Sequence, residues 1–276
     1  MTRQRAILLL TLTALLWSLG GIFIKSIHWN PLAIAGIRSA VAACFLFACT
    51  KKFKFTWSKL QWSTAIAYVA TVILFVSATK LTTAANAILL QYTAPIYVAI
   101  FSYWYLKETV TRFDWLTIVI VICGMTIFFV DNLSTENFLG NILAIASGIS
   151  FAWLTLFLRR QKGISTTESI FLGNILTFLI TLPFMFQAPL NATGWYLLIA
   201  MGIIQLALPY FLYAKAIIHV TALEAILVPV IEPVLNPIWV FLINGEEPSK
   251  AAFIGGTIVI GAVTANAIYK SKKKKS

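Results

Sequence analysis

The chain has 276 residues, of which 60% are hydrophobic and 11% are charged. Soluble domains usually carry about 25% charged residues, so this composition excludes a soluble globular protein and indicates an integral membrane protein. The net charge of +12 suggests a nucleic-acid ligand, but the positions of the basic residues argue against one.

Ten apolar segments follow one another between short polar breaks, and each is about long enough to cross a hydrocarbon core of about 30 Å as a helix. Lipid offers no partner to an open backbone, and the segments lack the alternation of barrel strands. We predict an all-α integral membrane protein with ten transmembrane helices. They span residues 6–27, 31–50, 61–79, 83–105, 113–130, 138–158, 166–186, 194–214, 221–243 and 251–269.

Most of the 21 Lys and Arg residues fall on one side of the membrane when the N-terminus is placed inside. This is the positive-inside asymmetry, so both the N- and C-termini are predicted to be cytoplasmic. The basic C-terminal run is part of the same asymmetry, which makes the lipid bilayer the expected partner and leaves no role for nucleic acid. A bacterial cytoplasmic membrane is the expected location.

The chain resembles itself at a shift of 138 residues, half its length. Its halves, 1–134 and 135–276, each hold five predicted spans, and an odd number inverts the second copy relative to the first. Inverted repeats are typical of alternating-access transporters. The matching residues are Thr83, Ala84, Ala87, Ile88, Leu89, Pro95 and Glu108 in the first half and Thr221, Ala222, Ala225, Ile226, Leu227, Pro233 and Glu246 in the second.

Several local patterns together resemble the ten-helix EamA-like branch of the drug/metabolite transporter superfamily. They are ALLWSLGGIFIK (14–25), NPLAIAGIR (30–38), TAANAILLQYTAP (83–95) leading to Glu108, and the second copy at 231–233 leading to Glu246. The resemblance implies a secondary carrier with a substrate cavity between helices one to four and six to nine. It also implies peripheral fifth and tenth helices, and export of small metabolites such as amino acids or amines.

Three ionisable residues lie well inside predicted spans: Arg38, Glu224 and Glu232. Such residues normally face the bundle interior or a water-filled cavity, because their charge is costly in lipid. Arg38 and Glu232 are both near mid-depth and could form a structural ion pair. Their charges with Glu224 sum to −1, so we hypothesise that one glutamate binds a coupling proton or the ammonium end of the substrate. For Glu224, stabilisation of a helix N-terminus is the alternative.

The predicted ninth span contains three prolines at four-residue spacing, and Pro95 lies at the equivalent place in the fourth. Each removes a backbone donor, which loosens the helix and favours a hinge, although a static kink is the alternative. The prolines of the ninth span are Pro229, Pro233 and Pro237, and Asn236 precedes the last of them.

Polar and aromatic residues inside other spans complete the predicted site. Asn86 is equivalent to Glu224, so inversion would place these two groups at opposite membrane faces, where gates would lie. Gln91 is a further polar candidate. Trp17, Tyr92, Trp153 and Tyr210 could line a cavity and stack on a cation, although packed or lipid-facing aromatics are as common.

No catalytic motif, metal-ligand spacing or nucleotide-binding loop appears, so we expect no enzyme activity, cofactor or metal. The predicted function is secondary active export of small organic molecules. The alternatives are an uptake carrier for a cationic amine and a membrane assembly or flippase component that transports nothing itself. The sequence leaves the oligomeric state open, a homodimer included.

Overall fold

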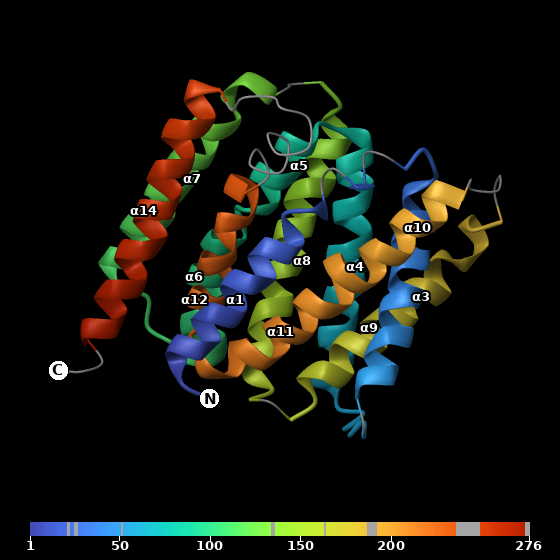
Figure 1. Cartoon of the computed structure of the whole chain (residues 1–276). Helices are drawn as coiled ribbons and strands as arrows, with labels where there is room; N and C mark the ends of the chain where they lie inside the picture. The colour runs from blue at the N-terminus through green and yellow to red at the C-terminus, as the bar shows by residue number, and fades with distance from the viewer. Residues whose placement is uncertain are drawn as a thin grey trace.

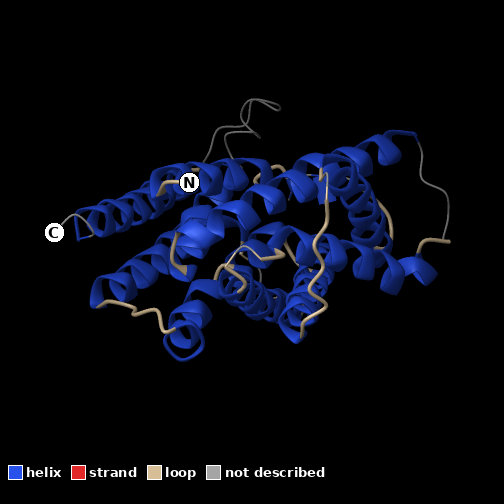
Figure 2. Ribbon diagram, turned by 90° about the horizontal axis from the view of Figure 1, so that it is seen from below, coloured by secondary structure: helices blue, strands red, loops and turns tan. Residues whose placement is uncertain are grey.

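The computed structural model describes residues 1–20, 23–24, 27–50, 52–133, 136–162, 164–186, 192–235 and 249–273. Within these ranges all regular structure is helical, and loops join the helices (Figures 1 and 2). The expected all-helical architecture is therefore found in the described part of the chain.

Eight helical stretches are long and apolar enough to cross a membrane, as expected for a multi-pass membrane protein. Two of them include 3-10 or π-helical turns: Thr166–Phe184 combines α9 (Thr166–Thr181) and η2 (Leu182–Phe184), and Ala192–His219 combines α10 (Ala192–Ala200), η3 (Met201–Ala207), α11 (Leu208–Ala216) and η4 (Ile217–His219). The others are α3 (Pro31–Cys49), α4 (Lys59–Leu81), α5 with α6 (Ala84–Gln91 and Ala94–Leu106), α7 (Arg112–Phe129), α8 (Phe138–Arg160) and α14 (Lys250–Lys273).

The first and ninth predicted spans are described only in part. The first contains α1 (Arg3–Trp17). The last part of this span includes residues 21–22 and 25–26, which lie outside the described ranges. The ninth contains α12 (Ala222–Leu227), the 3-10 helix η5 (Val228–Ile231) and helical residues 232–235. The count of ten spans thus stays a prediction.

Threonine side chains set the starts of two equivalent helices. Thr83 accepts a hydrogen bond from the backbone N–H of Asn86 at the start of α5. Thr221 accepts one from the backbone N–H of Glu224 at the start of α12, and Glu224 bonds back to the Thr221 N–H. These caps satisfy donors that a helix start leaves open, and they stand 138 residues apart.

Prolines interrupt two of the predicted spans. The fourth breaks between α5 and α6 at Tyr92 and Thr93, because Pro95 has no N–H to bond the Gln91 carbonyl one turn earlier. At Pro229 the ninth span changes from α-helix to the 3-10 helix η5. The predicted irregularity is therefore present at both prolines, whereas the hinge role of Pro95, Pro229 and Pro233 stays a prediction. Pro237 lies outside the described residues.

Helices from distant parts of the chain form the main contacts. The largest pairings join α4 to α8, α7 to α14, α3 to α9, α4 to α9 and α1 to α11. Figure 1 shows α7 and α14 side by side at one edge of the bundle, as expected for the fifth and tenth spans, and α3 with α9 toward the other edge.

Both termini lie at one end of the bundle (Figure 1). The Arg3 guanidinium donates to the Ala267 carbonyl at 3.3 Å, which ties the start of α1 to the end of α14. We call this end the terminal face and the other end the opposite face.

Gly148 allows α8 to cross the break between α5 and α6 closely. A Cβ atom at this position would lie 2.7 Å from the Gln91 carbonyl oxygen and 3.2 Å from that of Leu90. Both atoms belong to the backbone and cannot move aside as a side chain can. Ala144, Gly148 and Ala152 form a row of small residues on α8, and all three are buried, as close helix packing requires.

Candidate functional site

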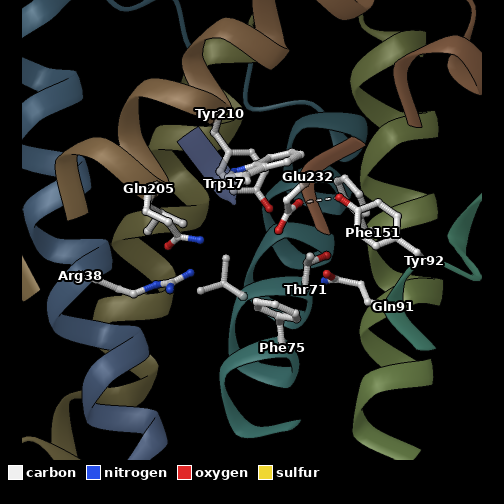
Figure 3. Close-up of a pocket in the computed structure, with 12 residues that line it drawn as sticks. Trp17, Arg38, Thr71, Phe75, Gln91, Tyr92, Phe151, Gln205, Tyr210 and Glu232 are labelled. Carbon is white, nitrogen blue, oxygen red and sulfur yellow. Dashed lines mark hydrogen bonds between the residues drawn. The ribbon is translucent and has the colours of Figure 1, made fainter. Parts of the chain in front are cut away.

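A chamber of about 40 Å³ lies in the middle of the bundle (Figure 3). Six of the predicted site residues line it: Trp17, Arg38, Gln91, Tyr92, Tyr210 and Glu232. The remaining lining residues are Thr71, Val72, Phe75, Phe151, Gln205 and Leu206. Residues from α1, α3, α4, α5, α8 and the Ala192–His219 stretch therefore converge on one space with Tyr92 and Glu232.

Arg38 of α3 is 2% exposed, and its guanidinium points into the chamber (Figure 3). Its Nε and Nη1 atoms have no hydrogen-bond partner among the described residues. The structural ion pair with Glu232, which the sequence left open as an alternative, is not among the salt bridges of the described residues, although both side chains line the same chamber. A buried guanidinium without an acceptor is costly, so this group is poised to bind an anion.

Gln205 lies beside Arg38 and was missed by the sequence analysis (Figure 3). It is 5% exposed, and its Oε1 atom has no partner among the described residues. Its amide packs against Gly20, where a Cβ atom would overlap the amide nitrogen. The sequence does contain a signal for Gln205, because this amide side chain lies inside an apolar predicted span. Gln91 was selected by the same signal.

Glu232 enters the chamber from the side opposite Arg38 and is bonded to Tyr92 (Figure 3). The Tyr92 hydroxyl also lies 3.0 Å from the Pro229 carbonyl oxygen. These contacts join the end of α5 to η5 and to the helical turn that follows it. Two proline-interrupted segments, one from each half of the chain, therefore meet at this tyrosine.

Replacing Tyr92 with Phe should lower the free energy of unfolding by about 1–2 kcal/mol, because a buried carboxyl and a buried carbonyl lose their hydroxyl partner. Tyr97→Phe is the matched control, since no described group bonds the Tyr97 hydroxyl. Thermal unfolding of both purified variants measures the difference. Equal melting temperatures would contradict the stabilising role of the Tyr92 contacts.

Aromatic rings cover the Glu232 side of the chamber. The Trp17 ring lies 5.1 Å from that of Tyr210 and 5.7 Å from that of Phe151, with edge-to-face geometry in both pairs. These rings offer π faces to a cation in the chamber. Trp153 does not line the chamber, because it stacks on Phe101 with ring centroids 5.0 Å apart.

Glu224 and Asn86 lie away from the chamber, at opposite ends of the bundle. Glu224 forms an ion pair with Arg3 at the terminal face, in addition to its capping of α12. Asn86 donates to Asn141 at 2.9 Å, and Thr82 donates to the same Asn141 oxygen at 2.9 Å. Glu224 and Asn86 therefore lie at opposite ends of the bundle, as predicted. Asn236, another predicted site residue, lies outside the described residues.

Three salt bridges between described residues lie at the terminal face. Besides Arg3 with Glu224, Arg159 pairs with Glu108 at 2.7 Å and Lys270 with Asp114 at 2.9 Å. Glu108 also accepts from the Ala222 N–H at 2.8 Å, so it links the end of α6, the end of α8 and the start of α12. The contacts described at Asn86 on the opposite face are neutral.

The eight apolar helical stretches are those of a multi-pass membrane protein, and the described residues enclose a buried polar chamber. A model of the EamA-like transporter family matches residues 4–130 and 138–267. The chain therefore belongs to the EamA-like transporter family, as its sequence patterns indicated.

Curated relatives are similar at modest identity. The pseudopaline exporter CntI of Pseudomonas aeruginosa is 29% identical over 197 residues, which cover 68% of this chain and 67% of that protein. The uncharacterized transporter YdfC of Bacillus subtilis is 26% identical over 203 residues, covering 71% of this chain and 66% of that protein. An uncharacterized transporter of Archaeoglobus fulgidus is 22% identical over 255 residues, covering 92% and 93%.

The fold is also found among solved structures. A protein of known crystal structure superposes with a TM-score of 0.82 at 16% identity, covering 95% of this chain and 96% of that one. At this identity the likeness concerns the fold alone.

Proposed function

We propose that this protein is a secondary active exporter of small organic metabolites, such as amino acids or amines, and that it performs no chemistry on them. The observation that carries the proposal is the buried chamber, which holds the unpaired Arg38 guanidinium and the Glu232 carboxyl at mid-bundle. Polar groups of this kind inside a membrane protein mark solute pathways. The pseudopaline exporter among the relatives supports the export direction.

Alternating access between two inverted five-helix halves, 1–134 and 135–276, is the mechanism we propose. The pairing of helices supports it, since α3 contacts its counterpart α9 and α7 contacts its counterpart α14. The contact of α4 with α8 is repeated by that of α11 with α1. Such a pattern is what a pseudo-twofold axis produces, and the chamber lies where two halves of this kind rock against each other.

The terminal face is proposed to be the cytoplasmic one. The basic residues support this orientation, because Arg3, Arg159, Arg160 and Lys270 cluster at that face. The positive-inside rule places such residues in the cytoplasm.

A coupling proton at Glu232 is the proposed driving ion. A tyrosine hydroxyl carries one hydrogen, yet Tyr92 lies within bonding distance of two acceptors, Glu232 and the Pro229 carbonyl. Both contacts are satisfied at once when Glu232 is protonated and donates to Tyr92. Release of that proton would free the carboxylate for a substrate ammonium, so the two ligands would exchange at one group.

Counterflow in proteoliposomes tests the transport function. Vesicles loaded with an unlabelled amino acid or amine should accumulate the labelled solute transiently without ATP, because a carrier exchanges solute across both faces. Glu232→Gln should lose the acceleration by an imposed proton gradient, and its exchange should require a higher solute concentration, because the carboxylate is also the proposed ligand of the substrate ammonium. Protein-free vesicles are the control. Absence of counterflow across the panel would favour the non-transporting alternative, and accumulation of amines alone would favour the amine carrier.

A further inference from the structure

We infer that the chamber is a dipolar site built for a small zwitterion, with the substrate carboxylate held by Arg38 and Gln205 and its ammonium held by Glu232 beneath the aromatic rings. This inference rests on the proposed transport function and narrows it. It assigns the substrate to the class of α-amino acids rather than simple amines.

The carboxylate end follows from the unsatisfied atoms around Arg38. The guanidinium is 2% exposed, and its Nε and Nη1 atoms have no partner among the described residues. A guanidinium presents its donors as a planar fork that matches the two oxygens of a carboxylate. The neighbouring Gln205 amide adds a donor and an acceptor, and its Oε1 atom is equally without a described partner.

The ammonium end follows from the opposite wall of the chamber. In Figure 3 the Glu232 carboxyl points inward below Trp17 and Tyr210, and one of its oxygens is bonded to Tyr92. The other oxygen has no donor in the part of the chain that the structure describes. A cation at this oxygen would also lie near the π faces of the two rings.

Arg38 and Glu232 line one chamber but do not form an ion pair with each other. An ion pair that served only to lock helices would bring these groups into contact, because burial makes separated charges costly. A ligand that carries both complementary charges satisfies the two groups together.

The size of the chamber agrees with a small substrate. Its volume of about 40 Å³ has room for a few water molecules. Pockets that enclose drug-sized ligands measure roughly 300 Å³ or more. A modest widening on opening would admit an amino acid, whereas a bulky amphipathic drug would require the aromatic wall to be rebuilt.

Binding to the purified wild-type protein provides the test. The proteinogenic amino acids are screened by thermal stabilisation, and the best binder is compared by calorimetry with its primary amide and its N-acetyl derivative. The amide lacks the carboxylate charge and the N-acetyl derivative lacks the ammonium. We expect the free amino acid to bind about tenfold to a hundredfold more tightly than either, since each derivative leaves a buried charge unpaired.

Variants test the carboxylate end of the site. Arg38→Met should lower the affinity for the free amino acid to that of its amide and leave the affinity for the amide unchanged. Gln205→Leu should reduce the same preference by a smaller factor. Arg5→Met is the matched control, because Arg5 is exposed and its side chain makes no hydrogen bond to a described residue. Ligand-free Arg38→Met should melt no earlier than wild type, since it loses an unpaired buried cation.

Three results would overturn the inference: no amino acid binds, the amide binds wild type as tightly as the acid, or Arg38→Met weakens the acid and the amide equally. The wild-type comparison needs no variant to fold. If binding shows the expected preference but counterflow is absent, the site stands and the carrier function fails. If counterflow occurs without a preference for the acid over the amide, the function stands and the zwitterion site fails.

Discussion

Gly148→Val should lower the melting temperature by about 3–10 °C and abolish counterflow. Its side chain would meet the carbonyl oxygens of Gln91 and Leu90, 2.7 and 3.2 Å from the position of the new Cβ atom. Pro95 leaves the Gln91 carbonyl without its helical donor, so this oxygen is exposed to α8. Relief of the overlap would push α8 away from the end of α5. Gln91 and Tyr92, which line the chamber, lie in that segment.

Gly261→Val is the matched control for this experiment. A Cβ atom at Gly261 of α14 would have no neighbour within 4 Å among the described residues, so the added side chain should cost little. Thermal unfolding and counterflow are measured for both variants. If the melting temperatures of Gly148→Val and Gly261→Val agree within a degree, the close approach of α8 to the α5–α6 break does not matter for stability.

Arg3→Gln should shift the conformational equilibrium toward opening at the terminal face by a factor of ten or more. The substitution removes the ion pair that joins the start of α1 to the start of α12. A hydrogen bond between charged groups of limited exposure contributes about 1.5–3 kcal/mol, and 1.4 kcal/mol corresponds to a factor of ten. The Asn86 and Asn141 contact at the opposite face remains and keeps that end closed.

Cysteine labelling measures this shift. Thr71 lines the chamber, so Thr71→Cys reports access to it when Cys44, Cys49 and Cys123, which are all exposed, are first replaced by Ser. Labelling from the terminal face should be faster in Arg3→Gln than in the parent protein. Arg5→Gln provides the control on the same helix. Equal labelling rates in the two variants would show that the Arg3 ion pair does not hold this face closed.

The sequence located much of the chamber because buried charge is rare in membrane helices. Arg38 and Glu232 were selected by their depth in apolar spans, and the structure places both at the chamber. Tryptophan gives a weaker signal, since Trp17 lines the chamber whereas Trp153 packs on Phe101. The local sequence around a tryptophan inside a span does not show whether its ring faces the chamber, a neighbouring helix or lipid.

The contacts that close the two ends depend on tertiary structure. Arg3 and Glu224 lie 221 residues apart, and nothing local to either residue indicates the other. The repeat nevertheless contained the information. Arg3 and Asn141 are separated by the same 138 positions as Asn86 and Glu224, so the Asn86 contact with Asn141 and the Glu224 contact with Arg3 are equivalent pairs. Extending the repeat alignment to residues near each helix start would have suggested both.

The π-helix η3 has an evolutionary consequence. Gln205 lies within Met201–Ala207, where the wider turn adds a residue to the regular helical register. Deleting one residue here would remove the wider turn and restore an ordinary helix, because a π-bulge holds its extra residue within that turn. The apolar neighbours Ile204 or Leu206 would then replace the amide beside Arg38. A single-codon deletion could thus change ligand choice at the Arg38 side of the chamber, to which Gln205 and Leu206 of this stretch contribute.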